Sequence, residues 1–248
     1  GLAREFIKKG KAVLVEKPVM ITRKESMDLI GLAALQNTVL MAGYILMYHP
    51  AVQKINEFLD ENNLIDDLCY MNMSRTGSSS HISGVDVLHD LAVHDIYLSR
   101  CFMREAPAWV IARGGCYAES PANNVIYILL GFPKGKIVSI FASLMHTEKT
   151  RKISLVTTKI KLIFDDLKPA GEKIQMFING ESNYSLVVEN ALEPLKCECK
   201  HFIECIRENR EPKSGSEAIN FVARITECIA ESLKKGGEKI MIHPSRSF

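Results

Sequence analysis

The stretch that decides the fold is Gly10-Lys-Ala-Val-Leu-Val-Glu-Lys-Pro18, near the start of the 248-residue sequence. Its apolar residues run without alternation, which is typical of a strand buried on both faces, as in a parallel sheet. Pro18 ends the run. Thr22 and Glu25 then have the spacing of a capping box, which predicts a helix over residues 23–36. The stretch therefore predicts a strand followed by a helix.

A second unit of the same kind follows at once. Thr38-Val-Leu-Met-Ala42 is another buried strand, followed by Gly43, and Pro50 suits the first turn of a further helix. Strand, helix, strand, helix is the order of a doubly wound α/β sheet. The sequence thus predicts that residues 13–16 and 39–42 are neighbouring parallel strands. We interpret residues 1–60 as the remnant of a dinucleotide-binding (Rossmann) domain.

Beyond residue 60 the pattern changes to closely spaced strands. Strand-like runs occupy residues 68–74, 108–112, 124–132, 137–144, 151–157, 160–164, 172–178, 185–188 and 239–242. Helical periodicity covers residues 87–103, 195–208 and 216–235. Short turns between strands favour an antiparallel arrangement. Residues 61–248 are therefore predicted to form an α+β domain with a large, mainly antiparallel sheet flanked by helices, so that the fold class is α/β plus α+β.

Composition excludes several classes of function. The net charge is +2 and the basic residues are scattered, which argues against nucleic-acid binding. The sequence has no run of apolar residues long enough for a membrane span. Seven irregularly placed cysteines suit a reducing cytoplasm. Cys197 and Cys199 have only His201 nearby, which falls short of a four-ligand zinc set and predicts no metal site.

Two groups of residues are candidates for chemistry. Glu16-Lys17-Pro18 stands at the carboxyl end of the first strand, the edge at which open α/β sheets bind ligands. Lys17 there either donates hydrogen bonds to a cofactor and a substrate hydroxyl or is simply solvated. Asp90 and His94 are four residues apart on a predicted helix, so the carboxylate can orient the imidazole as a general base. The alternative is a helix-terminal aspartate near a structural histidine.

Together these motifs resemble one family. The stretch ending in Glu16-Lys17-Pro18, Gly43 ahead of Tyr48-His-Pro50, and Asp90-x-x-x-His94 are similar in order and spacing to glucose–fructose oxidoreductase and inositol dehydrogenase (Gfo/Idh/MocA) over the whole chain. Arg75-Thr-Gly77 and Lys149-Thr-Arg151 look most like the branch of UDP-N-acetylglucosamine 3-dehydrogenases. Met47 and Tyr97 depart from that branch, which usually has Arg and Asp there.

The resemblance implies a nicotinamide-dependent oxidoreductase acting on a sugar or nucleotide sugar with NAD or NADP. His94 would take the proton of a sugar hydroxyl, and Lys17 would bridge cofactor and hydroxyl. Asp90 would hold His94 or contact the sugar. Glu16, Lys17 and Pro18 would lie against the cofactor. Arg75 and Arg151 are candidates to hold a substrate diphosphate, although exposed salt bridges would explain them equally well.

One family motif is absent, because no Gly-x-Gly-x-x-Gly occurs in the sequence. We therefore expect the front of the nucleotide-binding domain to be missing and this chain alone to bind dinucleotide poorly. The rival hypothesis is a truncated, non-catalytic relative that acts as a scaffold or sugar-binding oligomer. Ile137-Val-Ser-Ile-Phe-Ala142 is apolar on both sides, which predicts a homo-oligomer formed through the outer face of the sheet.

Overall fold

The structure is a computed structural model and describes residues 1–78, 86–117, 122–178, 181–188 and 192–243. Within these ranges, every helix falls short of the length and apolarity needed to cross a membrane. A cytoplasmic location stays a prediction from the cysteine pattern.

The first unit is a small parallel sheet with two helices. Its elements are α1 (Leu2–Lys8), β1 (Val13–Val15), α2 (Arg23–Leu35) and β2 (Leu40–Ala42). β1 and β2 pair in parallel, with Val13 opposite Leu40 and Val15 opposite Ala42, so the predicted pairing is confirmed. The capping box also forms, because Thr22 Oγ1 accepts from the Glu25 amide at 3.2 Å and the Glu25 carboxylate accepts from the Thr22 amide at 3.1 Å.

The large sheet has nine strands in the described part of the chain. They are β3 (Leu68–Ser78), β4 (Trp109–Gly115), β5 (Val125–Gly131), β6 (Ile137–Ser143), β7 (Met145–Thr157), β8 (Ile160–Asp165), β9 (Ile174–Ile178), β10 (Glu181–Ser185) and β11 (Ile240–Met241). Their order is β10-β9-β8-β7-β3-β6-β5-β4-β11. Only the β3–β6 pair among them is parallel. The predicted fold class is thus confirmed.

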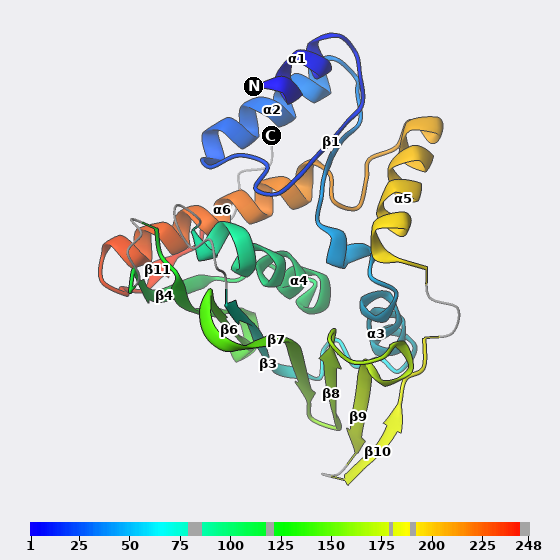
Figure 1. Cartoon of the computed structure of the whole chain (residues 1–248), viewed down its shortest axis with the longest axis vertical. Coiled ribbons are helices and arrows are strands. Elements are labelled where there is room, and N and C mark those ends of the chain that lie inside the picture. Colours follow the sequence, from blue (N-terminus) through cyan, green and yellow to red (C-terminus); the bar gives the residue numbers. More distant parts are fainter. Residues whose placement is uncertain (79–85, 118–121, 179–180, 189–191, 244–248) are drawn as a thin grey trace.

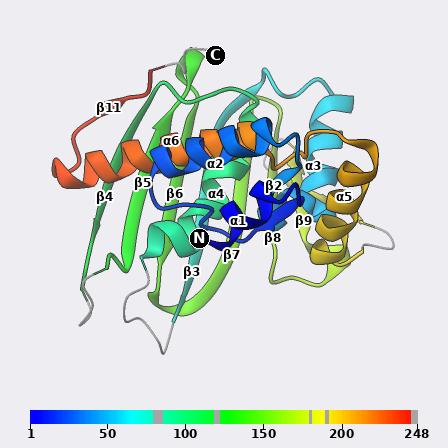
Figure 2. The same cartoon turned by 90° about the horizontal axis from the view of Figure 1, so that it is seen from above.

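Helices lie along one side of this sheet (Figure 1). They are η1 (Ile45–Tyr48), α3 (Pro50–Glu61), the π-helix η2 (Leu88–Ala92), α4 (Val93–Met103), α5 (Pro194–Glu208) and α6 (Ser216–Lys234). The single turns η3 (Pro133–Gly135) and η4 (Ala170–Glu172) lie between strands. In Figure 2, seen from above, α2 lies over α6 and both lie over the sheet, and the two helices are in contact. This layer of helices separates the small sheet from the large one.

Alternation along each strand gives the large sheet a buried face and an open face. Met71 and Met73 of β3 and Ile126 and Ile128 of β5 are buried under the helices. On the other face Tyr127 is 57% exposed and its ring stacks on Phe141 with centroids 4.5 Å apart. The core therefore lies between the helices and one face only, as period-two patterning requires.

Two details differ from the sequence predictions. The predicted strand at residues 185–188 is wrong, because the last hairpin strand is β10, Glu181–Ser185, paired to β9 with a bulge between Ser182 and Tyr184. The helix predicted over residues 87–103 begins as a π-turn rather than a regular α-helix. The proposed domain boundary at residue 60 stays a prediction.

Candidate functional site

Lys17 and Asp90 form an ion pair between the end of β1 and the π-helix η2. The Lys17 Nζ donates to the Asp90 carboxylate Oδ1 at 2.9 Å and to the Asp90 backbone carbonyl at 2.7 Å. The Lys17 side chain is 20% exposed. Two acceptors on one residue hold the ammonium group at the carboxyl edge of β1. Charge-assisted hydrogen bonds of this length are among the stronger ones in proteins.

The π-turn explains why Asp90 and His94 do not pair. A spacing of four residues places two side chains on one face of a regular α-helix, but the π-turn at Leu88–Ala92 widens the helix between them. Asp90 contacts Lys17, and no hydrogen bond joins it to His94 in the described part of the chain. Asp90 is therefore not the residue that holds His94 in this structure, and His94 has a different partner.

That partner is Tyr97, one turn further along α4. Its hydroxyl lies 3.3 Å from His94 Nδ1 and accepts a hydrogen bond from the Leu46 amide at 3.0 Å. The Tyr97 ring stacks on Tyr44, with centroids 4.5 Å apart. Burial raises the pKa of Tyr97 well above its usual value, so the hydroxyl keeps its proton. Tyr97 thus holds one nitrogen of the imidazole from a fixed position.

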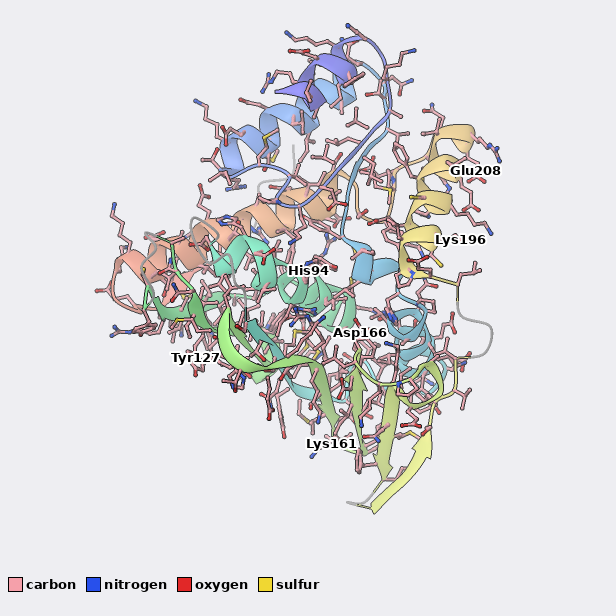
Figure 3. All side chains as sticks on the ribbon, in the orientation of Figure 1. His94, Tyr127, Lys161, Asp166, Lys196 and Glu208 are labelled. Carbon is pink, nitrogen blue, oxygen red and sulfur yellow. The ribbon has the colours of Figure 1, made fainter. Side chains whose placement is uncertain are left out.

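His94 is half-buried above the sheet, near the centre of the molecule (Figure 3). Burial, followed by the positive charges of Arg75, Lys17 and Arg151, lowers its pKa well below the usual value. The ring is therefore neutral at pH 7 and keeps one nitrogen free to accept a proton. The same interactions place Lys17, Arg75 and Arg151 within electrostatic range of the imidazole.

Of the two arginines, Arg75 is already occupied. It is 5% exposed, and its Nε and terminal nitrogen donate to the two carboxylate oxygens of Asp95 at 3.2 and 2.8 Å. Arg151 stands opposite it in the β3–β7 register and is only half-buried. It donates to the Thr76 carbonyl at 2.5 Å. Arg151 is accordingly the better placed of the two to meet a ligand.

A second set of polar residues was missed by the sequence reasoning. Asp166, after β8, lies 3.1 Å from His49 Nε2 and 2.7 Å from Lys173 Nζ. Burial raises the pKa of Asp166, but the hydrogen bonds from His49 and Lys173 outweigh it and lower the pKa to about 2. The His49 Nδ1 accepts from the Ala51 amide at 3.0 Å and caps α3. A histidine directly before Pro50 is a sequence signal for this cap, whereas nothing in the sequence points to Asp166 as its partner.

The sequence reasoning also missed Glu198, a residue of α5 whose side chain lies near Glu16 at the end of β1. It is 1% exposed, and its Oε1 has no hydrogen-bond partner among the residues that the structure describes. Burial, together with the charge of Glu16, raises its pKa to about 7. Glu16 itself lies close to Gly43, where an added Cβ would come within 3.1 Å of its carboxylate. Glycine at this position therefore leaves room for Glu16.

Known proteins resemble this chain in sequence. The family model described as the GFO/IDH/MocA C-terminal domain matches residues 69–163. The uncharacterized oxidoreductase YrbE of Bacillus subtilis (strain 168) is 21% identical over 248 residues, covering 95% of this chain and 72% of the relative. Residues 69–163 of this chain are thus similar to the C-terminal domain of the Gfo/Idh/MocA oxidoreductases.

Solved structures of several oxidoreductases have the same fold as this chain. The UDP-N-acetylglucosamine 3-dehydrogenase of Acidithiobacillus ferrooxidans gives a TM-score of 0.84 at 20% identity, over 95% of this chain and 74% of that one. An inositol dehydrogenase homolog from Azotobacter vinelandii, complexed with NAD+, gives 0.85 at 16% identity, over 97% and 74%. A second structure of that homolog, with NADH and myo-inositol, gives 0.81 at 16% identity, over 97% and 74%.

The residues described here fit the nicotinamide end of such a cofactor. Glu16, Lys17 and Pro18 follow directly on β1, at the edge where this fold class binds ligands. In the described part of the chain, the buried Glu198 Oε1 near Glu16 accepts no hydrogen bond, so it suits an N–H donor such as a carboxamide. The sequence contains no glycine-rich turn for the pyrophosphate.

Proposed function

We propose that this chain carries the proton-transfer and sugar-binding part of an NAD(P)-dependent dehydrogenase acting on a sugar hydroxyl. The observation that supports it is one arrangement: a neutral His94 held by Tyr97, next to a Lys17 ammonium held by Asp90. Neutral base and fixed cation are the two groups that alcohol oxidation requires beside a hydride acceptor.

His94 takes the hydroxyl proton in this proposal. The tautomer with its proton on Nδ1 donates to the Tyr97 oxygen, which has a second lone pair besides the one used by Leu46. Nε2 then accepts the proton as the carbon–oxygen double bond forms. When bound, the nicotinamide supplies the acceptor for the hydride that leaves the same carbon. In the reverse direction His94 returns the proton to oxygen.

Lys17 stabilises the negative charge that develops on the reacting oxygen. Asp90 uses a carboxylate and a carbonyl oxygen to hold Nζ, which leaves the third N–H of the ammonium for substrate. Asp90 therefore acts by positioning Lys17, and Glu16 and Pro18 position the cofactor.

A nucleotide sugar is the narrower version of the proposal. It assigns a substrate diphosphate to Arg75 and Arg151. Pairing of Arg75 with Asp95 leaves Arg151 as the guanidinium with the greater exposure. Comparing a free sugar with its UDP derivative tests this version.

We expect His94→Gln to lower kcat/KM for sugar oxidation about 10²- to 10³-fold, the usual contribution of a general base. The measurement is NAD and NADP reduction at 340 nm with a panel of sugars and cyclitols, at high dinucleotide concentration because this chain is expected to bind dinucleotide poorly. The matched control is His146→Gln, because His146 is exposed and its described hydrogen bonds are local ones with the backbone of Glu148. The acid limb of the wild-type kcat/KM profile should lie below pH 6.5, the ordinary pKa of histidine, because the pKa of His94 is lowered.

Equal rates in His94→Gln and the wild type would contradict the assignment of the base. Sugar binding that His94→Gln leaves unchanged, without turnover at any dinucleotide concentration, would favour the rival function, a non-catalytic sugar-binding scaffold.

We also propose a homo-oligomer formed through the open face of the large sheet. Tyr127, Tyr70 and Ile137 are 57%, 40% and 38% exposed on this face. An apolar sheet face that the chain's own helices leave open is typical of a protein interface.

A further inference from the structure

A cavity of about 440 Å³ lies beside the candidate site. Its walls come from η1 and the start of α3, from the β8–β9 connection and from the segment before α5. Most of the lining is apolar, with Ile45, Leu46, Ala51, Ala170, Leu192 and Pro194 among it. The volume falls within the usual range for small-molecule sites.

The polar groups of the cavity largely satisfy one another. Asp166 accepts a hydrogen bond from Lys173 at 2.7 Å and pairs with His49 at 3.1 Å. The Asp166 carboxylate therefore neutralises the charge of Lys173. Glu193 adds a carboxylate to the rim. With one cation against two carboxylates, the cavity offers no net positive charge to a phosphate group.

The cavity adjoins the groups proposed for catalysis. Leu46 lines it, and the Leu46 amide donates to the Tyr97 hydroxyl that faces His94. Asp166 lines it as well, and its charge acts on Arg75 and Arg151, which in turn act on His94. Figure 3 shows Asp166 and His94 in the central part of the molecule. A group attached to a sugar bound at His94 therefore has this cavity within reach.

We propose that the cavity binds an uncharged, apolar group linked to the reacting sugar, such as an aryl aglycone, rather than a nucleoside diphosphate. This inference rests on the proposed function, since it assigns the reacting sugar to His94. Apolar walls gain from burying a ring, while Asp166 and Glu193 repel phosphates.

Calorimetric titration of the full chain tests the assignment. The probes are glucose, galactose, mannose and N-acetylglucosamine, their 4-nitrophenyl glycosides, and UDP-glucose. The aryl form of at least one sugar should bind about tenfold more tightly than the free sugar, from burial of one ring. Ala170→Trp, which fills the cavity from an exposed position, should remove that gain and leave the free sugar within about twofold, because it does not touch His94.

Two further variants make the test specific. Ala230→Trp adds the same ring at an exposed position of α6 and should leave all affinities unchanged. Leu192→Ala removes apolar wall and should weaken only the aryl glycosides, which keeps the test valid if Ala170→Trp fails to fold.

The outcomes separate the two proposals. Failure of every aryl glycoside to bind better than its sugar overturns the cavity assignment. Tighter binding of UDP-glucose that Ala170→Trp abolishes overturns it too, in favour of a nucleotide. Aryl glycosides that bind as expected, with affinities that His94→Gln leaves unchanged, support the cavity assignment and overturn the placement of the sugar at His94.

Discussion

Glu198 is a buried carboxyl group whose protonation should change the stability of the fold. Its folded pKa of about 7 lies above the usual value of 4.5, because of burial and of Glu16. A raised carboxyl pKa means that the unfolded chain loses its proton first. The contribution of protonated Glu198 to the free energy of unfolding is therefore fully present below pH 4.5. It is lost as the pH rises from 4.5 to about 7.

We expect Glu198→Gln to remove this loss, so that at pH 8 the variant is more stable than the wild type by roughly 2 kcal/mol. The measurement is the free energy of unfolding in urea at pH 4.5, 6 and 8. The control is Glu61→Gln at the exposed end of α3. A difference between wild type and Glu198→Gln that stays constant across this pH range would contradict the assignment.

Single residues also show where sequence reasoning stopped. Lys17, Asp90 and His94 were recognisable because short motifs carry them. Tyr97 was seen only as a departure from a pattern, yet its hydroxyl contacts His94. Asp166 and Glu198 acquire their surroundings from residues far away in the chain, so no local pattern reveals them.

Among the elements, α2 is begun by side chains that the sequence identifies. Thr22→Ala removes the Oγ1 that accepts from the Glu25 amide, and should lower the free energy of unfolding by about 1 kcal/mol. Thr22→Ser keeps the acceptor and should behave almost like the wild type. Urea unfolding monitored by circular dichroism measures both, and equal losses in the two variants would show that the cap contributes nothing.

The positions of helices and strands were predictable where burial gives the apolar residues a regular spacing along the sequence. β1, β2 and most strands of the large sheet matched, because alternation or unbroken apolar runs mark them. The last hairpin was misplaced by several residues, since its bulge breaks the alternation. The π-turn at Leu88–Ala92 was missed because periodicity over so short a stretch cannot separate it from an α-helix.

For the whole molecule, the open sheet face determines the expected assembly. The double variant Tyr127→Arg and Tyr70→Arg should convert the expected oligomer of this protein into monomers. Two charges on a buried apolar interface are costly to desolvate. Light scattering at several concentrations measures the mass. Leu35→Arg on α2, a residue 83% exposed away from this sheet, is the control and should leave the assembly intact. A wild type that stays monomeric at high concentration contradicts the proposal.

The cavity beside Asp166 has a consequence for how the protein can diversify. Its outer walls belong to the β8–β9 connection and the segment before α5, whereas His94 and Lys17 are held by other parts of the chain. Insertions and substitutions in those two connections can reshape the pocket without moving His94 or Lys17. Laboratory evolution aimed at new glycosides would do best to randomise these connections first and leave the helix that carries His94 untouched.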